Sequence, residues 1–192
     1  MTLHRRHALA LFASACGGAL ASPAFAQAPA MSRPTAFAFS FSTLDGKSLR
    51  LAEHAGKPIL IVNTASQCGY TPQYAGLQQL WSELHGRGLM ILGVPSNDFG
   101  GQEPGGPDEI NKTAHGQYGV GFPLAAKAEV RGPSAHPFYK WAADIRPKDV
   151  PRWNFHKYLI GRDGYIAEVF PESVAPSDTR VKTAIARALA DS

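Results

Sequence analysis

Two short apolar runs with a helical pattern between them constrain the fold of this chain most strongly. Ile59 to Val62 and Leu89 to Val94 are almost entirely apolar, which is typical of strands buried on both faces of a sheet. Apolar residues recur at helical spacing from Leu77 to Leu84, and Thr71 is predicted to cap that helix, with Pro72 at its first position. A strand, a helix and a second strand in this order predict a parallel crossover and an α/β fold.

The rest of the chain contains further strand and helix signals around this unit. The glycine- and proline-rich stretch from Pro95 to Pro107 predicts a loop at the carboxyl end of the second strand, where open parallel sheets collect their ligand sites. The other predicted elements are a hairpin from Phe37 to Leu51, helices over Asp108–His115 and Ala135–Ile145, a hairpin from Lys157 to Phe170 and an amphipathic helix over Pro176–Ala190.

Residues 1–26 have the anatomy of a secretory signal peptide. Arg5 and Arg6 precede a mostly apolar run that is too short to span a bilayer permanently, and small residues around Ala24 and Ala26 predict cleavage after Ala26. The paired arginines also resemble a twin-arginine signal. Lipid anchoring through Cys16 is the weaker alternative. We therefore expect a periplasmic or secreted protein without stable membrane insertion.

Removal of the signal leaves a chain of the size of one domain. The 166 remaining residues lack two of the 19 basic residues, so the formal net charge falls from +4 to +2. We expect a flexible mature N-terminus over residues 27–36 and one domain over 37–192. The lysines and arginines are scattered, which argues against nucleic-acid binding.

Cys68 is the one cysteine that the mature chain keeps, so no internal disulfide can form. Between a strand and a helix N-terminus, a thiol is favoured as a thiolate by unpaired N–H groups and by the helix dipole. A lone cysteine is more often a small buried apolar residue. The Gly69-Tyr70 turn that follows nevertheless favours exposure.

Three ordered strings, NTASQCGYTPQYAGL, GVPSNDFGGQEPG and WNFHKYLIGRDG, resemble the signatures of the glutathione peroxidase family. The resemblance extends over nearly the whole mature chain. It implies a thioredoxin-like α/β fold, with a central mixed β-sheet flanked by α-helices and an N-terminal β-hairpin. It also implies that the reactive group lies on the loop after the first core strand.

The same resemblance implies a catalytic set of four residues. Cys68 matches the peroxidatic cysteine of the family, and Gln102, Trp153 and Asn154 match its glutamine, tryptophan and asparagine. Such a thiolate attacks a hydroperoxide, while neutral amide and indole N–H groups stabilise the sulfur and the departing oxygen. Glutathione or a thioredoxin-like thiol is then the reductant, and neither a metal nor an organic cofactor is required.

Each of these residues has a simpler structural interpretation. Trp153 alone could serve packing, Asn154 could cap a turn, and Gln102 could be a solvated loop residue. Only their joint occurrence in the three strings favours catalysis. The histidines match no zinc spacing and are interpreted as structural or solvated, namely His115, His136 and His156.

Departures from the family pattern add further expectations. Many thioredoxin-dependent members carry a second cysteine where this chain has Ala114 and His115, so an external thiol must resolve the sulfenic acid on Cys68. Asp98 adds a negative charge near the expected site. The segment from Trp141 to Trp153 is short, as in monomeric relatives, and a monomer is expected.

A peroxide sensor or redox adaptor, which passes its oxidation to a partner protein, is the alternative function. It would use the same Cys68. Steady peroxide turnover with a small thiol favours the enzyme, whereas one oxidation followed by capture of one protein favours the adaptor. Thioredoxin-type exchange is disfavoured because Thr71 stands where that chemistry needs a second cysteine.

Overall fold

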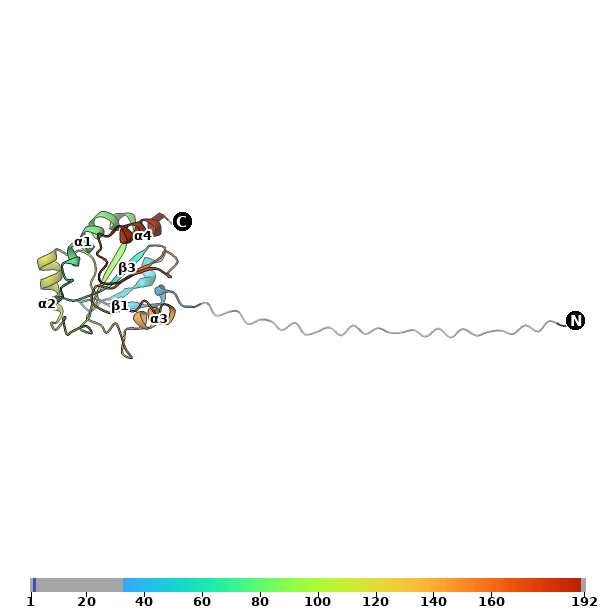
Figure 1. The fold of residues 1–192 in the computed structure, drawn as a ribbon, viewed down its shortest axis with the longest axis horizontal. Coiled ribbons are helices and arrows are strands. Elements are labelled where there is room, and N and C mark those ends of the chain that lie inside the picture. The colour runs from blue at the N-terminus through green and yellow to red at the C-terminus, as the bar shows by residue number, and fades with distance from the viewer. Residues whose placement is uncertain (1, 3–32, 191–192) are drawn as a thin grey trace. The chain divides into compact units, whose positions relative to one another are not determined.

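The computed structural model describes residue 2 and residues 33–190 (Figure 1). Apart from residue 2, the predicted signal peptide lies outside this part, and so does Cys16. Within the described residues, no helix combines the length and the apolar character that crossing a bilayer requires.

The predicted N-terminal hairpin is confirmed. Strands β1 (Ser40–Ser42) and β2 (Ser48–Arg50) pair antiparallel and form a small sheet of their own. Phe41 lies opposite Leu49, and both side chains are buried. These two apolar residues attach the hairpin to the rest of the domain.

Part of the stretch predicted to be flexible packs on the domain. Ala36 is fully buried, and its N–H donates to the carbonyl of Gly164. The carbonyl of Pro34 accepts a hydrogen bond of 2.7 Å from the indole N–H of Trp141. In the structure, residues 34–36 therefore belong with the domain.

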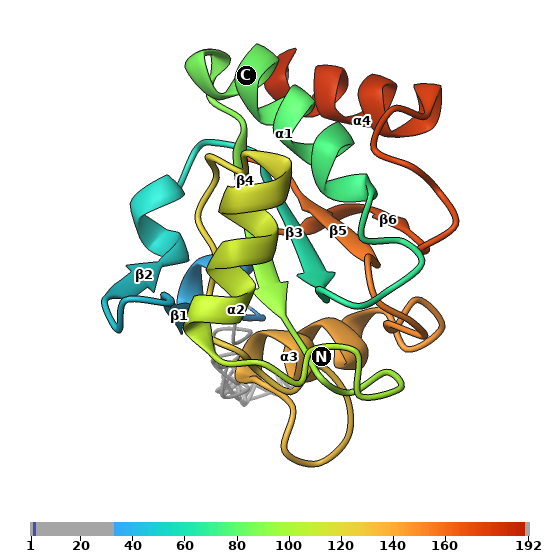
Figure 2. The ribbon, with the colours of Figure 1, turned by 90° about the vertical axis from the view of Figure 1, so that its left-hand side faces the viewer.

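A four-stranded mixed sheet forms the centre, as predicted, in the order β4-β3-β5-β6 (Figure 2). β3 pairs parallel with β4, and the β3–β5 and β5–β6 pairs are antiparallel. The strand bounds are Ile59–Thr64 for β3, Met90–Pro95 for β4, Lys157–Ile160 for β5 and Ile166–Phe170 for β6.

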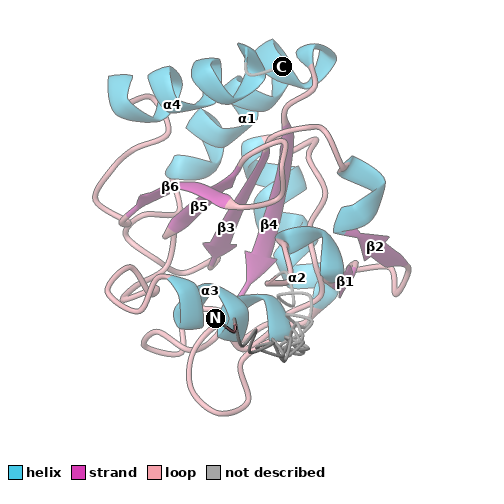
Figure 3. Cartoon of the chain, turned by 90° about the vertical axis from the view of Figure 1, so that its right-hand side faces the viewer, coloured by secondary structure: helices cyan, strands magenta, loops and turns pink. Residues whose placement is uncertain are grey.

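The helices cover both faces of this sheet. α1 and α4 lie on one face and α3 on the other (Figure 3). α2 continues directly into a π-helical segment. The bounds are Gln73–Leu84 for α1, Pro107–Asn111 for α2, Lys112–Gln117 for the π-helical segment, Pro137–Ile145 for α3 and Thr179–Ala190 for α4.

Strand β3 supplies the core on both sides, which explains its uninterrupted apolar run. Leu60 and Val62 pack in the cluster under α1 and α4, whereas Ile59 and Ile61 pack in the cluster under α3. All four side chains are fully buried, and each such burial stabilises the fold by about 1.5–3 kcal/mol. The loops that follow β3 and β4 are thereby held at one edge of a rigid sheet.

Candidate functional site

Cys68 lies in a tight turn between β3 and α1. Its backbone N–H donates to the Thr71 hydroxyl at 3.0 Å, and that hydroxyl donates to the carbonyl of Ala65 at 2.8 Å. The N–H of Tyr70 points at the Cys68 Sγ at 3.4 Å. Cys68 is buried, with 8% of the residue exposed, although the Gly69-Tyr70 turn favoured exposure. A backbone donor is already in place to stabilise its sulfur as an anion.

The prediction that Thr71 caps α1 is wrong. The helix begins at Gln73, and its N-cap residue, Pro72, makes no side-chain capping bond. The Thr71 hydroxyl accepts from the Cys68 N–H and donates to the Ala65 carbonyl, so both of its hydrogen bonds lie within the turn that carries Cys68. Thr71 thus shapes the cysteine turn instead of the helix end.

Gln102 and Asn154 lie in direct contact, although 52 residues separate them. The Asn154 side-chain amide donates to Gln102 Oε1 at 2.9 Å, and Asn154 is fully buried. The backbone carbonyl of Gln102 accepts from the backbone N–H of Gln67 at 3.0 Å. Gln102 is therefore attached to the residue that precedes Cys68, and its own amide N–H groups are left to donate elsewhere.

Trp153 borders this arrangement without a hydrogen bond to the other three predicted residues. Its side chain is 37% exposed and packs on Phe99 with ring centroids 5.9 Å apart. A Cβ on Gly100 would lie 3.7 Å from the Trp153 ring. Trp153 is thus held against the loop that carries Gln102, with its indole available at the surface.

Glu103 is a buried residue of this loop that sequence reasoning missed. Its carboxylate accepts from the Ser66 hydroxyl at 3.1 Å, and its N–H donates to Asn97 Oδ1 at 2.9 Å. Burial raises the pKa of Glu103, and the Ser66 bond opposes that rise. The Lys127 ammonium donates to the Glu103 carbonyl at 3.1 Å. Together these bonds hold Gln102 beside the cysteine turn. The one sequence signal for this role of Glu103 is its position next to Gln102.

Asp98, expected to add negative charge near the thiol, has a structural role. One of its carboxylate oxygens accepts from the backbone N–H groups of Val130 and Arg131, at 2.6 and 3.1 Å. These two donors compensate the charge and tie the loop after β4 to the segment that leads into α3.

The histidines have structural surroundings. His136 caps α3, because its Nδ1 accepts from the N–H of Phe138 while Nε2 contacts the carbonyl of Ser40 at 3.0 Å. His115 hydrogen-bonds the carbonyl of Val120. Among the residues that the structure describes, no three His, Cys, Asp or Glu side chains gather as a metal site would require.

His156 lies two residues after Asn154, and its pKa reports how strongly this part of the chain is buried. Burial first, and then the neighbouring Lys157, lowers the pKa of His156 to about 4, whereas an unfolded chain titrates near 6.5. Between these values the unfolded state binds the extra proton, so the free energy of unfolding falls as the pH falls from 6.5 to 4.

We expect His156→Phe to remove on the order of 2–3 kcal/mol of this pH dependence. Urea unfolding of both proteins at several pH values from 4 to 7 measures it. Parallel curves for the variant and the wild type would contradict the assignment.

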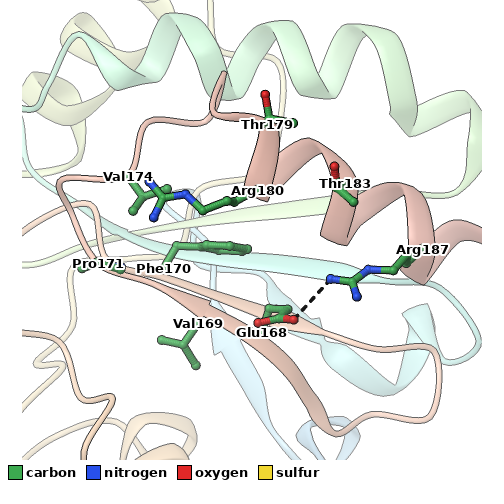
Figure 4. Close-up of a pocket in the computed structure, with 9 residues that line it drawn as sticks. All are labelled: Glu168, Val169, Phe170, Pro171, Val174, Thr179, Arg180, Thr183 and Arg187. Atoms are coloured by element: carbon green, nitrogen blue, oxygen red, sulfur yellow. Dashed lines mark hydrogen bonds and ion pairs between the residues drawn. The ribbon is translucent and has the colours of Figure 1, made fainter.

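A groove of about 470 Å³ between β6 and α4 contains none of the four predicted residues (Figure 4). Phe170 and Val174 give it an apolar floor. Both of its arginines are paired, Arg180 with Asp178 at 2.7 Å and Arg187 with Glu168 at 3.4 Å. Their charges are therefore satisfied within the protein.

Comparisons with known proteins agree with the geometry. The sequence model of the glutathione peroxidase family matches residues 36–143. The hydroperoxy fatty acid reductase gpx1 of a Synechocystis species is 43% identical over 159 residues, which cover 78% of this chain and 94% of that protein. The glutathione peroxidase-like peroxiredoxin GPX5 of Chlamydomonas reinhardtii is 38% identical over 162 residues, with 80% and 100% covered.

The solved structures give the same result for the fold. The crystal structure of Trgpx in its apo form superposes with a TM-score of 0.68 at 30% identity, over 83% of this chain and 98% of that one. The predicted thioredoxin-like fold is confirmed, and the relatives support thiol-dependent reduction of peroxides. This chain belongs to the glutathione peroxidase family.

Proposed function

We propose that Cys68 is the residue that reacts with peroxide in this thiol-dependent peroxidase. The Cys68 thiolate attacks the terminal oxygen of R–O–O–H, and the O–O bond breaks as the S–O bond forms. Sulfur is oxidised to the sulfenic acid, while the departing RO⁻ takes up a proton and leaves as an alcohol, or as water when R is hydrogen. The observation that carries the proposal is the Asn154–Gln102 hydrogen bond beside the cysteine turn.

Gln102, Asn154 and Trp153 would stabilise the charge that develops in this step. Because Asn154 occupies Oε1 of Gln102, the Gln102 amide is oriented with its N–H groups free to donate. The Trp153 indole adds another neutral donor at the edge of the site. Neutral donors stabilise both the thiolate and the departing oxygen without repelling an incoming thiolate reductant.

An external thiol would complete the cycle. Ala114 is buried in the π-helical segment, where many relatives carry their second cysteine, and Cys68 is the free cysteine of the described residues. A thiol R′SH would condense with the sulfenic acid, releasing water and forming a mixed disulfide, and a second thiol would release Cys68. Glutathione and thioredoxin-like proteins both have this chemistry.

The sequence of residues 1–26 supports export, so we place the mature monomer in the periplasm or outside the cell. Two relatives are named hydroperoxy fatty acid reductases, at 43% and 45% identity. We therefore include organic hydroperoxides, fatty acid hydroperoxides among them, beside hydrogen peroxide as substrates.

Peroxide consumption with glutathione and with a thioredoxin system, measured in parallel, tests this function. We expect many turnovers per Cys68 with at least one donor. A single stoichiometric oxidation with either donor, followed by a mixed disulfide with one protein, would favour the redox adaptor.

Without any thiol, excess peroxide is expected to inactivate the enzyme irreversibly. Among the described residues Cys68 has no second cysteine to protect it, so its sulfenic acid is oxidised further to the sulfinic acid. Mass spectrometry should find the Cys68 peptide heavier by two oxygen atoms, and prior addition of the thiol donor should prevent this. A peptide that stays unmodified while activity is lost would contradict the mechanism.

A further inference from the structure

The backbone immediately after Trp153 and Asn154 takes a conformation that needs support. Phe155 has φ of 70°, the one positive φ of a non-glycine residue in the described part of the chain. A side chain with a Cβ disfavours this left-handed region, so surrounding contacts must hold it there. Phe155 is fully buried, and its ring packs edge-on against Tyr74 with centroids 5.3 Å apart.

Three hydrogen bonds hold this turn, and all of them end on the backbone of residues 153–155. The Phe155 N–H donates to the carbonyl of Asn63 at 2.6 Å, and the Asn63 side-chain amide donates to the carbonyl of Trp153 at 3.0 Å. The Lys157 amine donates to the carbonyl of Phe155 at 2.7 Å. Asn63 and Lys157 therefore both bind the backbone of the segment that carries two of the four predicted site residues.

Lys157 is the unexpected member of this arrangement. Its side chain is fully buried at the start of β5, where Val62 and Phe170 are its neighbours across the sheet. Burial lowers the pKa of Lys157 to about 7, partly opposed by the Glu172 carboxylate. Within the described residues, Lys157 forms no ion pair, and its one hydrogen bond goes to Phe155.

Burial of an amine without a charged partner costs stability, and an apolar side chain at this position would avoid that cost. Lys157 therefore lowers the stability of the core, while its amine supplies a hydrogen bond to the Phe155 carbonyl beside the site. Both the ammonium and the neutral amine can donate that hydrogen bond. The contact thus persists on either side of neutral pH.

We propose that Lys157 is a positioning residue for peroxide reduction, which holds Trp153 and Asn154 against the Gln102 loop through its hydrogen bond to the Phe155 carbonyl. It touches neither the substrate nor the sulfur. The inference rests on the proposed roles of Trp153 and Asn154, and it adds the element that fixes their common backbone.

Lys157→Met tests this by removing the donor while it keeps an unbranched, apolar side chain. We expect the rate constant for Cys68 oxidation by hydrogen peroxide to fall about tenfold, because the donors of the site lose their alignment. The rate of Cys68 alkylation by iodoacetamide, followed from pH 5 to 9, should fall less than the peroxide rate. The Tyr70 N–H still stabilises the thiolate, and only peroxide reduction also needs donors for a departing oxygen.

Leu159→Met is the matched control. Leu159 lies two residues further along β5, is fully buried and makes no bond to the turn. Both of its rates should match those of the wild type. In Lys157→Gln an amide N–H can still donate, so its peroxide rate should recover toward wild type relative to Lys157→Met. If Lys157→Met does not fold, the Lys157→Gln rates are compared directly with the wild type, and a smaller selective loss is expected.

Three results would overturn the proposal. They are an unchanged peroxide rate in the folded variant, an equal fall of the peroxide and alkylation rates, and equal losses in the methionine and glutamine variants. Cys68→Ser separates this failure from a failure of the proposed function. If that variant is inactive while Lys157→Met is fully active, Cys68 is the reactive residue and Lys157 does not position its partners.

Discussion

Replacement of Cys68 by serine is expected to abolish peroxide reduction, with a loss of at least about 10³-fold in the rate of peroxide consumption. A serine hydroxyl stays protonated at neutral pH and cannot form the sulfenic acid. The fold should persist, because the serine oxygen can accept the Tyr70 N–H and the backbone bond from Cys68 to Thr71 remains. Peroxide consumption with a saturating thiol donor measures the effect.

Cys16→Ser in the full-length chain is the matched control for this variant. Cys16 lies in the predicted signal peptide, so its replacement should leave the peroxidase activity unchanged. Thermal unfolding of both variants checks that the domain is intact. Full turnover in the folded Cys68→Ser protein would show that the mechanism proposed above is wrong.

Gln102→Ala should produce the second-largest loss, on the order of 10- to 100-fold in the rate of Cys68 oxidation. The substitution removes the amide donors of Gln102 and leaves the buried Asn154 amide without its acceptor. The backbone bond between Gln67 and Gln102 does not depend on the side chain and should keep the loop in place. Stopped-flow oxidation of the reduced enzyme by hydrogen peroxide measures the rate.

Gln67→Ala makes the same substitution one residue before Cys68. The Gln67 side chain is exposed, and only its backbone N–H contacts Gln102. Its oxidation rate should lie within about twofold of wild type. If the two alanine variants react equally fast, Gln102 has no part in the reaction.

Much of the fold could be predicted because its signals are local. The apolar run in β3, the crossover through α1 and the two hairpins follow from periodicity and turn residues, and the structure confirms them. A threonine before a proline is an N-cap signal, which is why the sequence predicts that Thr71 caps α1. The prediction is wrong because the Thr71 hydroxyl binds the Ala65 carbonyl instead. Its bond to Ala65 depends on how the turn folds back, which neighbouring residues do not encode.

The residues that support the site could not be predicted in this way. Glu103 and Lys157 are charged residues, which composition assigns to the surface, yet both are fully buried. Their partners, Ser66 and the Phe155 carbonyl, become neighbours only when the loops after β3 and β4 meet the start of β5.

By itself, the sequence determined the α/β class, the order of strands and helices, and the set of Cys68, Gln102, Trp153 and Asn154 as candidates. Apolar periodicity predicts the elements, and the resemblance of three strings to a known family implies the four candidates; neither requires knowledge of the chain's contacts. The tertiary structure alone decided that Asn154 binds Gln102, that Thr71 binds within the cysteine turn and that Lys157 binds the carbonyl of Phe155. Hydrogen bonds between distant segments depend on distance and direction in space, and only the packed sheet sets these.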